Sequence, residues 1–340
     1  MRRVILWLCL ICLLLGGCVP RQAAQPKHYT ATFLTLFDTV TTIGGPAASE
    51  EEFQVMAQQI HDDLEQYHRL FDIYIAYEGL TNLKIVNDSA GIAPVAVDPA
   101  ILQLLSDCKS YYQLTGGRVN VMLGSVLSLW HEARNDGIRD PMNARLPDPE
   151  ALSAAAAHGD MDSLILDEGK GTVYISDPLS SLDVGAVAKG WACQRAAENA
   201  PKGLLISVGG NVCATGPKTE AGDPWVIGIQ NPDGGDYLHT IYVSGGCVVT
   251  SGDYQRTYTV AGEKYHHIID PDTLMPGTLW RSISVVCPDS ALADALSTAL
   301  FLLPLAEGQA LLDACGAEAL WVDKSGQEYM SPGFQEILRT

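Results

Sequence analysis

The chain has 340 residues with 21 basic and 40 acidic side chains, which gives a formal charge of −19. Hydrophobic residues make up 47% and charged residues 18% of the chain, so it carries enough apolar material for a core and is not intrinsically disordered. The acidic excess excludes nucleic acid as an expected partner, because the phosphate backbone would be repelled rather than neutralised. Thirty-two glycines and 18 prolines indicate many tight turns and much β structure.

The N-terminus reads as an export signal. Two arginines precede the apolar run Val4–Leu15, which is too short for a lasting membrane span. The following Leu15–Cys18 stretch resembles a bacterial lipobox, in which Cys18 would be acylated and become the mature N-terminus. We therefore expect a signal peptide over 1–17, a tether over 18–30, and a lipid anchor on the outer face of a bacterial cytoplasmic membrane. An ordinary signal peptide that contains a cysteine is the alternative.

The remaining cysteines do not form a metal-binding pattern. Of the nine cysteines, Cys9 and Cys12 lie in the signal and Cys18 lies at the lipobox. The others are Cys108, Cys193, Cys213, Cys247, Cys287 and Cys315. None of these belongs to a C-x-x-C pair and most lie in apolar stretches, so we expect buried free thiols rather than a zinc site.

Hydrophobic periodicity predicts one α+β domain over 31–340. A strand is expected over Phe33–Ile43, and helices over Glu50–Leu70, Pro99–Leu114 and Pro149–His158. Short β-like runs separated by turns then follow, at Ser163–Leu166, Val173–Ser176, Leu204–Val208, Trp225–Gln230, Thr240–Val243, Arg256–Val260, Tyr265–Ile269 and Ser282–Cys287. A helix over Asp289–Leu303 is the last element expected. No repeat or linker divides the chain.

Several stretches carry residues suited to chemistry. In Leu182–Gly190, small residues separate Asp183 from Lys189, so a phosphate could approach the backbone with Lys189 supplying positive charge. A simple β-to-α turn is the other interpretation. A glycine pair follows in Ser207–Asn211, and Thr115–Gly124 either lines a cleft or connects a helix to a strand.

Two adjacent histidines, His266 and His267, follow the stretch Val249–Tyr254. In a strand they would point to opposite faces and could not both bind one ion. One of them could face a pocket, or both could be packed and hydrogen-bonded.

The last predicted helix carries a candidate metal site. Asp294 and Thr298 are four residues apart, so their oxygens project from one face of an otherwise apolar helix. A hard cation such as Mg²⁺ would satisfy the carboxylate. A packing or capping role is the alternative, because a threonine can also bond to the backbone one turn earlier.

Five of these stretches together resemble, in order, the motifs of the ApbE-type flavin transferases, the FAD:protein FMN transferases. The matching segments are Leu182–Gly190, Val208–Asn211, Thr250–Tyr254, His267–Pro271 and Ala293–Thr298. The resemblance covers the chain from about Phe33 to its end and implies a T-fold-like α+β domain. Two segments depart from the family pattern: Phe37-Asp38-Thr39 replaces M-G-T, and Asn120-Val121-Met122 replaces Asp-x-Thr.

The resemblance implies roles for individual residues. Asp294 and Thr298 would bind Mg²⁺ together with the backbone carbonyl of Ala186. FAD contacts are implied for Phe37, Tyr74, Val119, Asn120, Val121, Asp183, Lys189 and Ile268. Asp183 and His267 are the candidates for a general base.

The implied reaction is phosphoryl transfer. A serine or threonine hydroxyl of an acceptor protein would attack the FMN-side phosphorus of FAD, and AMP would leave. The resemblance points to membrane-associated redox subunits as acceptors. Two rival functions are a Mg²⁺-dependent FAD pyrophosphatase and a lipoprotein that binds flavin without chemistry.

Overall fold

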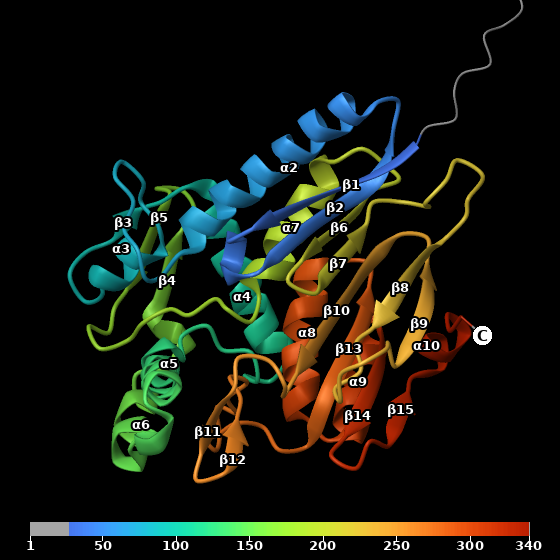
Figure 1. The fold of residues 1–340 in the computed structure, drawn as a ribbon. Coiled ribbons are helices and arrows are strands. Elements are labelled where there is room, and N and C mark those ends of the chain that lie inside the picture. The colour runs from blue at the N-terminus through green and yellow to red at the C-terminus, as the bar shows by residue number, and fades with distance from the viewer. Residues whose placement is uncertain (1–26, 340) are drawn as a thin grey trace, which may run out of the picture.

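The centre of the molecule is an antiparallel sheet of eight strands, seen in the computed structural model, which describes residues 27–339 (Figure 1). Neighbours follow the order β1-β2-β6-β7-β10-β13-β14-β15. These strands are β1 (Lys27–Leu34), β2 (Val40–Ala47), β6 (Leu205–Val208), β7 (Asn211–Ala214), β10 (Gly246–Gly252), β13 (Trp280–Cys287), β14 (Glu318–Asp323) and β15 (Glu328–Met330). The expected signal peptide and Cys18 lie outside the described residues.

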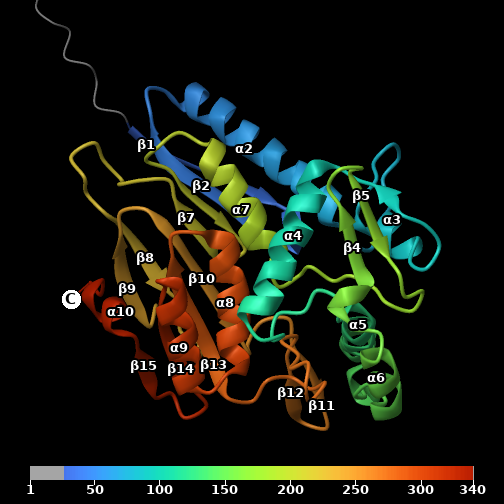
Figure 2. The same cartoon turned by 180° about the vertical axis from the view of Figure 1, so that it is seen from behind.

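Helices cover one face of this sheet, as the view from behind shows (Figure 2). They are α2 (Glu50–Phe71), α7 (Ala188–Asn199), α8 (Ser290–Leu302) and α9 (Leu305–Cys315). The hairpin of β8 (Trp225–Ile229) and β9 (His239–Val243) covers the other face together with α10 (Pro332–Glu336). The sheet is therefore buried on both sides over much of its area.

A smaller sheet and further helices lie beside α7 (Figure 1). They comprise β3 (Val95–Ala96), β4 (Leu164–Asp167), β5 (Thr172–Ile175), α3 (Leu83–Asp88), α4 (Pro99–Leu114), α5 (Gly124–Arg139) and α6 (Pro149–Ala156). The remaining elements are the hairpin β11 (Tyr258–Val260) and β12 (Glu263–Tyr265), and the 3-10 turns η1 (Leu36–Asp38), η2 (Pro141–Asn143) and η3 (Met161–Ser163).

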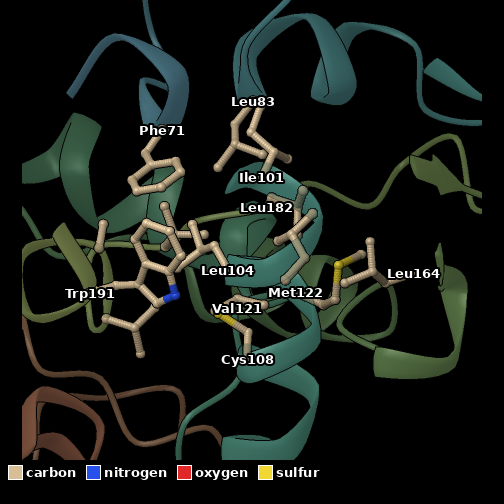
Figure 3. Packing of buried hydrophobic residues seen from close by; sticks show 14 of the residues in the cluster. Phe71, Leu83, Ile101, Leu104, Cys108, Val121, Met122, Leu164, Leu182 and Trp191 are labelled. Carbon is tan, nitrogen blue, oxygen red and sulfur yellow. The ribbon is translucent and has the colours of Figure 1, made fainter. Parts of the chain in front are cut away.

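One apolar cluster joins the smaller sheet and its helices to the helices that cover the main sheet. Figure 3 shows members of this cluster: Leu104 of α4, Trp191 of α7, and Val121 and Leu182 from the segments between helices. The same cluster includes alanines of α8. The described residues therefore form a single α+β domain, as the sequence predicts.

The predicted helices are confirmed, and local sequence explains why. In α4, Pro99 stands at the first helical position and the Asp98 side chain accepts a hydrogen bond from the backbone N–H of Ala100. In α8, Asp289 caps the backbone N–H of Leu292 in the same way. Both helices bury the apolar residues that suggested them.

The predicted strand Phe33–Ile43 is wrong. The chain instead turns back over Thr35–Asp38, so that β1 and β2 pair as a hairpin with Leu34 opposite Val40. The turn contains neither glycine nor proline, and Asp38 is its only residue of a common turn-forming type, so its signal in the sequence is weak. In addition, β1 begins at Lys27, inside the stretch expected to be tether.

Two further expectations fail near the C-terminus. The predicted strand Tyr265–Ile269 is wrong, because only Tyr265 belongs to a strand, as the last residue of β12. The helix Asp289–Leu303 is not the last element, since α9, β14, β15 and α10 follow it. Within residues 27–339, no helix combines the length and the apolar character needed to cross a membrane.

Candidate active site

A cavity of about 820 Å³ opens beside α7 and α8. It brings together nearly all of the site residues that the sequence predicts. Those that line it are Phe37, Tyr74, Val119, Asn120, Asp183, Ala186, Lys189, His267, Ile268, Asp294 and Thr298. Val121 is not among the lining residues, because its side chain is 1% exposed and packs in the apolar cluster instead (Figure 3).

Asp294 is a buried carboxylate with three partners. Its Oδ2 accepts hydrogen bonds from the backbone N–H of Gly190 at 2.9 Å and from Nδ2 of Asn211 at 3.0 Å. The Nζ of Lys189 lies 3.7 Å from the same oxygen. These partners suffice to stabilise a carboxylate that is 4% exposed. Oδ1 has no hydrogen-bond partner among the described residues, so it is the oxygen left to a ligand in the cavity.

Thr298 lies one helical turn after Asp294 and also lines the cavity. Its hydroxyl makes no hydrogen bond within residues 27–339. The back-bond to the helix is made by Ser297 instead, which donates to the carbonyl of Asp294 at 2.9 Å. The bond from Thr298 to the backbone one turn earlier, which the sequence left open, is therefore not made among the described residues.

The carbonyl of Ala186 is also free of hydrogen bonds among the described residues. In a longer helix it would accept from the N–H of Gly190, four residues on. That N–H donates to Asp294 instead, and the first intrahelical bond of α7 runs from Trp191 to Val187. The carbonyl of Ala186 thus remains available on the cavity wall.

These three oxygens fit the metal that the sequence predicts. A carboxylate, a hydroxyl and a backbone carbonyl are the hard donors that Mg²⁺ prefers, and they leave room for water and phosphate oxygens. All three belong to residues that line one cavity, and none of them makes a hydrogen bond among residues 27–339.

Lys189 adds positive charge at the same wall. It stands in the first turn of α7, where unpaired backbone N–H groups and the helix dipole favour anions. Its Nζ lies near Asp294 and donates to the carbonyl of Gly185 at 3.4 Å. The turn before α7 is therefore suited to a phosphate.

Asp183 belongs to a second polar group in the cavity. Its Oδ1 accepts from the N–H of Gly185 at 2.8 Å, and its Oδ2 lies 3.9 Å from Nδ1 of His131. That ring nitrogen lies 2.9 Å from the hydroxyl of Tyr74. Burial lowers the pKa of His131, and the nearby Asp183 opposes that shift only in part. A neutral His131 therefore accepts the hydrogen bond from Tyr74.

The two adjacent histidines have different surroundings. His266 is packed, with Nε2 2.9 Å from the carbonyl of Gly277 and its ring edge-on to Phe301. His267 lines the cavity, and its buried Nδ1 has no hydrogen-bond partner among the described residues. Burial, together with the positive charges of Arg256 and Lys189, lowers the pKa of His267 to about 3. His267 is therefore neutral at physiological pH.

The turn around Phe37 is strained. Phe37 and Asp38 have φ values of 53° and 54°, in the left-handed region that favours glycine. The N–H of Phe37 donates to Nδ1 of His68 at 3.2 Å, and the two rings pack edge to face. These contacts hold Phe37 at the cavity wall.

Asn120 uses its side chain to shape its own loop. Nδ2 donates to the carbonyl of Gly159 at 2.8 Å, and Oδ1 accepts from the N–H of Met122 at 2.9 Å. The carbonyl of Val121 accepts from the N–H of Asp183 at 2.8 Å. Val121 therefore acts on the cavity through its backbone, which positions Asp183.

Three cationic side chains that were not predicted from the sequence also line the cavity. Arg118 forms ion pairs with Asp270 at 3.1 Å and Asp272 at 2.6 Å. Arg134 and Arg256 form no ion pair within the described part of the chain. Two unpaired guanidinium groups in a protein with a net charge of −19 indicate an anionic ligand.

These residues carry little signal in the sequence. Arg134 and His131 lie three residues apart on α5, which no motif marks and whose glycines obscure the helical pattern. Asn211 does lie in a recognised glycine-pair motif, but its contact with Asp294 spans 83 residues.

The model of the ApbE family matches residues 33–321. The chain belongs to the ApbE family. Among curated members, an FAD:protein FMN transferase of Treponema pallidum (strain Nichols) is 33% identical over 309 residues, covering 83% of each chain. One of Klebsiella pneumoniae (strain 342) is 28% identical over 266 residues, covering 76% of this chain and 79% of its own.

Solved structures of ApbE proteins have the same fold. The ApbE protein of Thermotoga maritima MSB8 superposes with a TM-score of 0.81 at 28% identity, covering 92% of this chain and 100% of its own. The flavin transferase ApbE of Vibrio cholerae superposes with a TM-score of 0.76 at 24% identity, with the same coverage. The expectation of an ApbE-type α+β domain is confirmed.

Proposed function

We propose that this ApbE-family enzyme transfers FMN from FAD to a serine or threonine hydroxyl of an acceptor protein, with release of AMP. One observation carries the proposal. One cavity is lined by Lys189 and by three residues, Ala186, Asp294 and Thr298, that each have an oxygen without a hydrogen bond among the described residues, and the ammonium group of Lys189 lies 3.7 Å from the carboxylate of Asp294. A site for a cation next to a site for an anion is what the pyrophosphate of FAD requires.

Ala186, Asp294 and Thr298 would hold Mg²⁺. Its charge would neutralise the phosphate oxygens and favour the departure of AMP. Lys189 and the N-terminal amides of α7 bind the phosphate that they face. Tyr74, Ile75 and Ile138 line the cavity while more than half of each side chain stays exposed, and they provide apolar contact for a flavin ring.

The acceptor hydroxyl attacks the FMN-side phosphorus, and the bond from that phosphorus to the AMP oxygen breaks. The hydroxyl proton passes to a base as the new phosphoester forms. His267 is the first candidate because it lines the cavity and its Nδ1 has no hydrogen-bond partner among residues 27–339. Asp183 is the second candidate, and its Oδ2 is free to take the proton since only Oδ1 is held by Gly185.

A Mg²⁺-dependent FAD pyrophosphatase would use the same residues, with water in place of the acceptor hydroxyl. A pure flavin binder would need no free oxygens beside the phosphates. Incubation of the protein with FAD, Mg²⁺ and a Ser/Thr acceptor separates the three functions. Flavin-labelled acceptor supports the transferase, free FMN and AMP support the pyrophosphatase, and unchanged FAD supports the binder.

The same assay tests the metal assignment. Asp294→Ala should lower FMN transfer by orders of magnitude, and Mg²⁺ should rescue Asp294→Asn better because an amide oxygen is still a weak ligand. Asp313→Asn, on the exposed side of α9, is the matched control and should transfer at the wild-type rate. Full activity in EDTA would contradict the assignment.

We further propose that Cys18 is acylated and holds the enzyme on the outer face of the cytoplasmic membrane, where membrane-associated redox subunits are its acceptors. The Leu15–Cys18 lipobox supports this proposal. Cys18→Ser should abolish lipid labelling and release the protein from membranes. A variant that stays acylated and membrane-bound would contradict it.

A further inference from the structure

Three thiols meet behind the metal-binding carboxylate. The Sγ of Cys213 on β7 lies 2.8 Å from the Sγ of Cys247 on β10 and 3.2 Å from the Sγ of Cys193 on α7. All three side chains are at most 3% exposed. The proposed transfer reaction uses none of them.

The arrangement does not suit a metal ion. Within the described residues, the clusters of His, Cys, Asp and Glu close enough to share an ion do not include these cysteines. Cys213 lies between the other two, so the thiols form a row rather than a triangle. A bond between two of them is the chemistry that this row allows.

The sheet register selects one pair. Gly209 and Gly210 form a two-residue turn with positive φ, so the flanking Val208 and Asn211 are a hydrogen-bonded pair of β6 and β7. Main-chain groups alternate in direction along a strand, so Cys213 also points its N–H and carbonyl toward β6. Thr215, two residues after Cys213, faces the same side, because its backbone N–H donates to the carbonyl of Leu204 just before β6.

Cys213 and Cys247 are therefore directly opposite each other at a non-hydrogen-bonded position of β7 and β10. The Cα atoms at such positions are about 4.5 Å apart, which is within the range that a disulfide spans, about 4.4–6.8 Å. Cys287 faces Cys247 from β13, but at the wider hydrogen-bonded position. Within residues 27–339, the thiol of Cys247 forms hydrogen bonds with Cys213 and Gln194 and none with Cys287.

We propose that Cys213 and Cys247 form a cross-strand disulfide when the protein meets a disulfide-bearing oxidant. The thiolate of Cys213 attacks one sulfur of the oxidant and releases its other half as a thiol. Cys247 then attacks the sulfur of Cys213 and releases the second half. The two cysteines lose two electrons and two protons, and these appear in the two thiols of the reduced oxidant.

The surroundings of Cys213 favour it as the attacking sulfur. Hydrogen bonds from Cys193 and then Cys247 lower the pKa of Cys213, and burial opposes this shift. Burial also limits access, so the oxidant reacts while the sheet is forming or when it opens locally.

The disulfide would fasten the strands that support the metal site. Asn211 of β7 and Val249 of β10 form the cross-strand pair that lies two positions along from Cys213 and Cys247. The same Asn211 holds Oδ2 of Asp294. A bond between Cys213 and Cys247 thus fixes the two strands directly beneath the metal-binding carboxylate.

Peptide mapping tests the proposal, because trypsin separates the three thiols. Cleavage after lysine and arginine leaves Cys193 in residues 190–195, Cys213 in 203–218 and Cys247 in 219–256. The full chain is refolded with glutathione disulfide, denatured in N-ethylmaleimide and digested. We expect the peptides 203–218 and 219–256 to be joined, and Cys193 to carry the alkyl group.

Variants give an independent measurement. Cys193→Ser and Cys287→Ser should keep the cross-link, and Cys213→Ser and Cys247→Ser should lose it. Reduction should lower the Tm of the wild type by roughly 4–10 °C and leave the Tm of Cys213→Ser unchanged. A wild type with both thiols alkylated after refolding, or a cross-link between 190–195 and 203–218, would overturn the proposal.

Discussion

The backbone N–H of Gly190 on α7 donates to Oδ2 of Asp294 on α8 at 2.9 Å. Asp294 thereby caps an N-terminal N–H of α7 that has no partner within its own helix. The same bond uses the N–H that the carbonyl of Ala186 would otherwise accept from, and it engages Oδ2 of Asp294 rather than Oδ1. One contact between two helices therefore prepares two of the three proposed metal ligands.

This contact requires glycine at position 190. A Cβ there would lie 2.4 Å from the carbonyl oxygen of Ser290 and 2.5 Å from Cβ of Asp294. We predict that Gly190→Ala pushes α7 away from α8 and lowers the free energy of unfolding by about 1–3 kcal/mol. FMN transfer should fall as well, because the contact with Asp294 is lost. Urea unfolding and the transfer assay measure the two effects. Gly169→Ala, in an exposed loop, is the control, and equal stability of both variants would contradict the prediction.

The strained turn at Asp38 predicts a stabilising substitution. Asp38 has φ 54°, a conformation that glycine adopts without a steric penalty. Asp38→Gly should raise the free energy of unfolding by about 0.5–1 kcal/mol, and Asp38→Ala should not raise it. Denaturant midpoints of the two variants decide this. If Ala stabilises as much as Gly, loss of the carboxylate is the cause rather than the backbone.

The buried His267 predicts a dependence of stability on pH. Its pKa is lowered to about 3 in the folded protein, against about 6.5 in an unfolded chain. Between these values the unfolded state binds a proton that the folded state does not, so stability falls as the pH falls from about 6.5 to 3. His267→Gln should remove a slope of up to about 1.4 kcal/mol per pH unit. Thermal unfolding of wild type and variant across this pH range measures the effect. Identical dependence of stability on pH in the two proteins would contradict a buried neutral His267.

Arg134 and Arg256 line the cavity without an ion pair among residues 27–339, and they predict salt-dependent binding of an anionic ligand. We expect Arg134→Ala and Arg256→Ala each to raise the Kd for FAD roughly 3–10-fold at low salt, with a smaller effect at high salt. Flavin fluorescence titration measures both. Arg139→Ala is the control on the same helix, because Arg139 is exposed and paired with Asp136. An Arg139→Ala effect as large as the others would indicate only a general loss of charge.

The sequence by itself determined the elements whose signals are local. The helix Pro99–Leu114 carries its own cap and a regular apolar face, and the structure has the same bounds. The resemblance to the ApbE family likewise implied ten side chains and one backbone carbonyl for the site, and the residues that carry them line one cavity.

Only the tertiary structure decided the remaining features. The turn at Thr35–Asp38 is held in part by the contact of Phe37 with His68, 31 residues away, which the local sequence does not show. The partners of Asp294 come from 83 and 104 residues away, and the sequence alone suggested a metal as the partner. Val121 turns into the core, and the thiols of Cys213 and Cys247 meet only through the pairing of β7 with β10. Contacts of this range depend on register and packing, which local periodicity does not encode.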